Sequence, residues 1–115
     1  MLVRTLVLVS TLAVVAPPVY ADERFDATAQ VAFGISVAEK GLWQEALYRW
    51  ERAVDIDPTY AAAWNNLGIA YEHAGSFDKA REAYEKALDL EPNNLMIQQN
   101  YDLFREINDR VNRNR

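Results

Sequence analysis

Apolar and small residues recur at spacings of three and four in the second half of the chain. Trp64, Leu67 and Tyr71 follow this spacing, which places them on one face of a helix. A second apolar face, made of Ala80, Tyr84, Ala87 and Leu88, follows closely along the sequence. The pattern predicts two helices separated at Gly75, because glycine readily adopts the left-handed conformation that ends a helix.

Residues that favour helix starts precede both predicted helices. Asp57 and Pro58 precede the first helix, and Ser76 precedes the second. Asp and Ser are common cap residues, and Pro is tolerated in the first turn because its missing N–H would be unpaired there anyway. We therefore expect Asp57 and Ser76 to cap these two helices.

The sequence matches itself when it is shifted by 34 residues. A fixed period in this range is typical of stacked repeats, so the chain divides into one unit at 27–60 and another at 61–94. The identical pairs at this offset are Ala27/Ala61, Ala29/Ala63, Gly34/Gly68, Ile35/Ile69, Gly41/Gly75, Ala46/Ala80, Glu51/Glu85, Ala53/Ala87, Asp55/Asp89 and Pro58/Pro92.

The second unit resembles a tetratricopeptide repeat. The residues that carry the resemblance are Trp64, Leu67, Gly68 and Tyr71, followed by Ala80, Tyr84, Ala87 and Pro92. The first unit keeps part of the pattern but has Gln30 where the second has Trp64. The resemblance implies an all-α, helix-turn-helix solenoid of five helices in a right-handed superhelix.

Residues 95–115 are interpreted as a capping helix with a basic tail. At the 34-residue offset, Gln98, Asp102 and Arg105 stand where the second unit has Trp64, Gly68 and Tyr71, so we expect this face to meet water. Ile97, Phe104 and Val111 are expected to cover the second unit. Terminal repeats are commonly atypical in this way.

The first 21 residues have the features of a secretory signal. Arg4 is followed by an apolar run of about a dozen residues, too short for a spanning helix, and then by a small-residue cleavage pattern that ends at Ala21. We predict cleavage before Asp22, a short linker at 22–26, and an exported protein, periplasmic or secreted, without a stable membrane anchor.

Composition narrows the possible functions further. The chain has 115 residues, 12 Lys and Arg against 17 Asp and Glu, one His and no Cys. The net charge of −5 argues against nucleic acid as a partner. With His73 as the sole histidine and no cysteine, we predict no catalytic residues, no cofactor and no metal, and therefore no enzyme. A metal-binding or enzymatic role remains a remote alternative.

The resemblance implies binding of a protein or peptide on the concave face, which is lined by the first helix of each unit. Helical spacing selects one stripe on each of these helices, and the resulting groove is mostly apolar. The predicted groove residues are Val31, Ile35, Asn65, Ile69, Glu72, Met96, Gln99 and Leu103. Basic residues that would grip a C-terminal carboxylate are missing from this groove.

The small number of repeats supports a second hypothesis. Stacked repeats usually need three or more units for stability, and this chain has two. The apolar stripes would then form an interface between copies, and the protein would be a self-associating structural subunit of a larger envelope complex. A homo-oligomer is therefore possible alongside a foreign protein partner.

Overall fold

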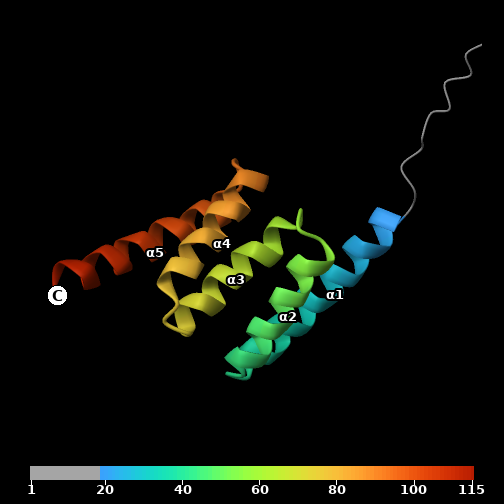
Figure 1. Cartoon of the computed structure of the whole chain (residues 1–115), viewed down its shortest axis with the longest axis horizontal. Coiled ribbons are helices and arrows are strands. Elements are labelled where there is room, and N and C mark those ends of the chain that lie inside the picture. Colours follow the sequence, from blue (N-terminus) through green and yellow to red (C-terminus); the bar gives the residue numbers. More distant parts are fainter. Residues whose placement is uncertain (1–18) are drawn as a thin grey trace, which may run out of the picture.

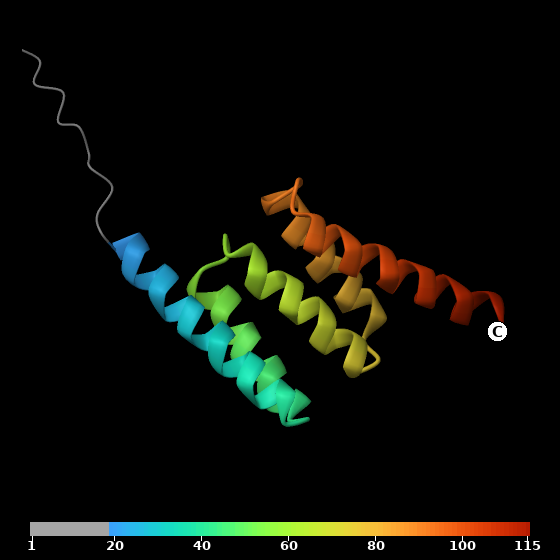
Figure 2. The same ribbon diagram turned by 180° about the vertical axis from the view of Figure 1, so that it is seen from behind.

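The computed structural model describes residues 19–115, with side chains described from residue 22. It contains five helices: α1 (Val19–Glu39), α2 (Trp43–Ile56), α3 (Ala61–His73), α4 (Phe77–Leu90) and α5 (Leu95–Arg113). The five predicted helices are confirmed. Figures 1 and 2 show α1, α3 and α5 running in one direction, with α2 and α4 returning between them.

The helices are arranged as two hairpins and a final single helix. α1 packs along α2, and α3 packs along α4. α3 also contacts α1, α2 and α5, so it is the central helix of the array. Figure 2 shows α1, α3 and α5 together on the near side, which defines the face that the first helix of each unit contributes.

A glycine ends the first helix of each hairpin in the same way. Gly41 and Gly75 have φ angles of 78° and 73°. The N–H after each glycine donates to a carbonyl five residues earlier, from Leu42 to Val37 and from Ser76 to Tyr71, both at 2.9 Å. This is the Schellman arrangement, which pairs carbonyls that a helix end would otherwise leave open.

Each hairpin is closed by an aromatic ring that lies against a glycine. A Cβ on Gly68 would lie 2.7 Å from Cε1 of Tyr84, and a Cβ on Gly34 would lie 2.7 Å from Cδ1 of Trp50. The Trp50 indole also donates to the backbone carbonyl of Val31 at 3.1 Å. These equivalent contacts fix how closely the two helices of each hairpin approach.

Alanines and large side chains fill the space between α3, α4 and α5. Ala80 and Ala87 are fully buried, as predicted. Ile97 and Phe104 of α5 are buried against the second hairpin and confirm its capping role, whereas Val111 is 40% exposed and does not cover that hairpin. Val111 lies in the last turn of α5, which continues beyond the part of the helix that packs.

The loop between α2 and α3 differs from the prediction. α3 begins at Ala61 with Tyr60 at its cap position, so Asp57 does not cap α3 and Pro58 lies outside the helix. The Asp57 carboxylate instead accepts hydrogen bonds from the backbone N–H and hydroxyl of Thr59, at 3.0 and 2.6 Å. Ser76 does occupy the cap position of α4, but its side chain makes no capping hydrogen bond.

Residues 22–26, predicted as a linker, are part of α1. Arg24 explains the difference, since it pairs with Asp57 and donates to the Thr59 hydroxyl at 3.0 Å. Its guanidinium also lies 4.8 Å from the centre of the Tyr60 ring. These contacts hold the first turns of α1 against the α2–α3 loop, and short-range sequence signals do not reveal them.

Replacing Gly68 with alanine should destabilise the fold. The added Cβ must displace the Tyr84 ring, and overpacking of this kind costs about 1–3 kcal/mol. In a Tyr84→Leu background the ring is gone, so Gly68→Ala should become neutral or stabilising by up to about 1 kcal/mol through helix propensity. Urea unfolding of the four variants measures both effects. A Gly68→Ala penalty that persists without the ring would contradict the proposed contact.

Acid should weaken the attachment of α1 through Asp57. Burial raises the pKa of this carboxyl, but hydrogen bonds from Thr59 and Arg24 outweigh burial and hold the pKa below its ordinary value of 3.8. The ionised group therefore contributes stability that is complete above pH 3.8 and is lost as the pH falls through the lowered pKa. Asp57→Asn should remove this part of the pH dependence.

The measurement is the urea midpoint across the acid range for wild type and Asp57→Asn. Asp55→Asn is the matched control, because Asp55 is exposed and lies two residues away at the end of α2. A wild-type profile that is unchanged by Asp57→Asn, or changed equally by Asp55→Asn, would contradict the assigned role of Asp57.

Candidate functional site

A hollow of about 330 Å³ lies between α1 and α3 on the side of the first helices. We call it the groove, and its lining residues are Ile35, Ala38, Glu39, Trp43, Trp50, Asn66 and Ile69. α1 and α3 form its two walls, and the tryptophans of α2 lie between them. The lining is mostly apolar, as the sequence predicted for this face.

The structure divides the predicted groove residues into three sets. Ile35 is 43% exposed, Met96 56% and Leu103 57%, and Gln99 is also exposed. Ile69 and Glu72 are half-buried. Val31 is only 5% exposed and Asn65 only 2%, so these two residues belong to the interior and not to an open groove.

The error at Val31 and Asn65 is one of helical phase. Positions turn by about 100° per residue, so a stripe at spacings of three and four includes residues on the boundary between core and groove. The groove lies further round each helix, which brings in Asn66, one residue after the predicted Asn65, and Glu39, four residues after the predicted Ile35. Packing against the neighbouring helix determines which residues of each helix face the groove. Hydrophobic spacing in the sequence does not reveal this packing.

Asn65 has a structural role that the sequence did not predict. Its side-chain oxygen accepts a hydrogen bond from Asn100 of α5 at 3.0 Å, and its amide donates to Asn66 at 3.4 Å. A buried amide needs such partners, because an unpaired one would lose its hydration without compensation. The asparagines therefore join α3 to α5 beneath the open face.

The tryptophans are groove residues that sequence reasoning missed. Trp50 closes the first hairpin against Gly34 and also lines the groove. Trp43 lines both the groove and a neighbouring hollow of about 250 Å³ that also includes Leu47 and His73. The His73 ring stacks on Trp43 with centroids 3.5 Å apart and planes 13° apart. This contact accounts for the position of the sole histidine.

Tyrosine hydroxyls join neighbouring helices through carboxylates. Tyr84 donates to Glu72, and Tyr101 donates to Glu85 at 2.7 Å. Burial, followed by the hydrogen bond and the nearby charge of Glu72, raises the pKa of Tyr84 strongly. Burial and the charge of Glu51 raise the pKa of Tyr71 to about 12. These hydroxyls therefore remain donors at any physiological pH.

Residues at the two ends of the array are more exposed than the equivalent residues in its middle. Leu67 is 2% exposed because the first hairpin covers it, whereas Phe33, at the equivalent position of the first hairpin, is 46% exposed. The Arg49 guanidinium lies 4.3 Å from the centre of the Phe33 ring and pairs with Glu45 at 2.8 Å. At the other end Gln98 donates to Asp102 at 2.9 Å. Polar side chains thus cover part of each end.

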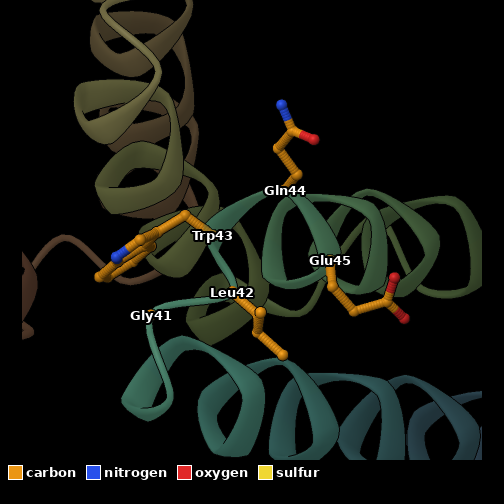
Figure 3. Close-up of a pocket in the computed structure, with 5 residues that line it drawn as sticks. All are labelled: Gly41, Leu42, Trp43, Gln44 and Glu45. Carbon is orange, nitrogen blue, oxygen red and sulfur yellow. The ribbon is translucent and has the colours of Figure 1, made fainter.

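A further hollow at the α1–α2 turn brings no chemical groups together. Its lining residues, Gly41, Leu42, Trp43, Gln44 and Glu45, are consecutive in sequence. Figure 3 shows their side chains pointing in different directions, with Leu42 toward α1 and Gln44 away from it. Among residues 22–115, no three His, Cys, Asp or Glu side chains come together as a metal site would require.

Each helix pair is closed by a glycine–aromatic contact, and the pairs stack on one another. This arrangement defines the chain as a helical-hairpin repeat protein. A tetratricopeptide repeat model matches residues 61–94, the predicted second unit, and another TPR repeat model matches residues 37–75. The chain belongs to the tetratricopeptide repeat family. Such repeats indicate a protein–protein interaction module, and proteins of this fold are typically non-enzymatic scaffolds.

Solved structures support the same assignment. Two crystal structures of MamA are each 32% identical to this chain, with a TM-score of 0.65 over 76% of it. The chain spans about half of the two MamA chains, 48% and 51% of their lengths. No curated protein matches this chain with significance.

Proposed function

We propose that this chain is an exported interaction module that binds an apolar segment of a partner protein along the groove and on the exposed Leu103 of α5, which continues the same stripe. The main support is the exposure of branched apolar side chains at equivalent positions of the first helices. Ile35 and Leu103 are about half exposed, and Ile69 lies between them at the same position of α3. One extended segment could contact all three in order.

The chemistry of the groove suits recognition better than reaction. Its polar groups are one amide and one carboxylate, Asn66 and Glu39, and the remaining lining is apolar. Binding would use shape and removal of apolar surface from water, which contributes about 25 cal/mol per Å². Because the hollow is small and open, we expect modest affinity.

Export is supported by the sequence pattern of residues 1–21, of which residues 1–18 lie outside the described part of the chain. Cleavage after Ala21 would make Asp22 and Glu23 the first residues of α1. Acidic residues are favourable at the positive N-terminal end of a helix. No helix within residues 19–115 is long and apolar enough to cross a membrane.

The cellular protein is predicted to begin at Asp22. Intact-mass measurement of protein from the exported fraction should give the mass of residues 22–115. Detection of a membrane-bound form that retains Met1 would contradict both the cleavage and the export proposals.

Leu103→Glu should weaken partner binding without unfolding the protein. The variant would place an unpaired carboxylate in the apolar contact, which should reduce affinity by about tenfold or more. Leu95→Glu is the matched control, because it is the same change on the same helix at an exposed residue that lies outside the stripe.

The test is affinity capture from an envelope fraction with wild type, Leu103→Glu and Leu95→Glu. We expect one set of proteins to be retained by wild type and Leu95→Glu and lost with Leu103→Glu. Circular dichroism checks that all three variants keep their helices. Equal capture by Leu103→Glu and wild type would place the binding surface elsewhere.

Self-association is the second candidate, favoured by the exposed apolar residues of α5. Met96, Leu103 and Ile107 form a stripe at helical spacing, and each is about half exposed. The same stripe could pair with another copy of the chain. A light-scattering mass above that of one chain, reduced to one chain by Leu103→Glu, would favour this function over a foreign partner.

A further inference from the structure

The groove has a negative end that the known family assignment does not explain. Glu39 lines the hollow close to the end of α1 and is exposed. Within the described residues, it makes no ion pair. Glu72 lies at the corresponding end of α3, where its carboxylate accepts the Tyr84 hydroxyl.

The backbone adds to the negative potential at the same end. α1 ends at Glu39 and α3 ends at His73, and the two helices run in parallel (Figure 2). A helix carries about half a negative charge at its C-terminus, so the two ends reinforce each other and the carboxylate of Glu39. An apolar hollow with a negative rim is therefore built from both side chains and main chain.

None of the positively charged side chains near α1, α3 and α5 lines the hollow. Arg24 lies at the opposite end of α1 and pairs with Asp57. Arg110 pairs with Glu106 on α5, and His73 stacks against Trp43. Lys40 directly follows Glu39, but it does not line the hollow.

We propose that the groove selects an apolar partner segment that carries a lysine or arginine next to an aliphatic residue. The aliphatic side chain would fill the hollow between Ile35 and Ile69, and the cation would pair with Glu39. This inference rests on the proposed function and names the chemistry of its partner. An acidic segment would meet repulsion at Glu39, with no cation in the lining of the hollow, so charge discriminates between segments that fit equally well.

The experiment is selection of short random peptides displayed on phage against the mature chain. The variant Glu39→Lys reverses the charge at the rim and keeps the apolar lining. Glu82→Lys makes the same change on α4, at an exposed residue outside the groove. Wild type and Glu82→Lys should enrich aliphatic residues next to Lys or Arg, whereas Glu39→Lys should enrich aliphatic residues next to Asp or Glu.

The enriched peptide is then measured directly. Trp43 and Trp50 line the groove, so tryptophan fluorescence reports its occupation. Replacing the basic residue of the peptide with glutamine should weaken binding about two- to five-fold at low salt, the range of an exposed ion pair. The difference should shrink as salt is added.

The outcomes separate this inference from the proposed function. Aliphatic enrichment without a basic preference, or an unchanged preference in Glu39→Lys, overturns the inference and leaves the apolar groove in place. A reversed preference in Glu82→Lys also overturns it, since net charge would then be the cause. Failure to enrich any peptide overturns both proposals.

Discussion

The fold depends on the contact between a glycine of one helix and an aromatic ring of the next. Gly34 under Trp50 and Gly68 under Tyr84 leave no room for a Cβ, so each hairpin closes at one fixed distance. Because both contacts stand at the same position in the 34-residue repeat, the second hairpin copies the first. Equivalent residues such as Ile35 and Ile69 are consequently presented on the same face.

On α5, the position equivalent to Gly34 and Gly68 has no glycine–aromatic contact. Asp102 stands where the glycine would be, and the described chain has no sixth helix to bring a ring against it. Its carboxylate accepts from Gln98 instead, which gives the terminal helix a polar side. At the other end Arg49 lies over the exposed Phe33 ring and covers part of it with a charged group. Polar side chains thus cover part of the apolar surface at both ends of the array.

Sequence periodicity predicted the features that repeat and missed those that occur once. The buried Ala80 and Ala87, the helix ends at Gly41 and Gly75, and the capping contacts of Ile97 follow from spacing and from the repeat. The docking of Arg24 on Asp57 has no counterpart in the second unit, and it extends α1 through the predicted linker. The phase of the groove also depends on helix packing, which buried Val31 and Asn65 and brought Glu39 and Asn66 to its surface.

A short array restricts how such a groove can be selective. The groove between the two hairpins has a volume of about 330 Å³, and apolar contact there distinguishes poorly between aliphatic side chains of similar size. Parallel helices place their negative C-terminal ends along one edge, and the carboxylate of Glu39 adds to the negative potential there. Repulsion of the wrong charge does not require a large contact area. In the proposed function, charge at the rim therefore supplies specificity that apolar contact in so short an array does not provide.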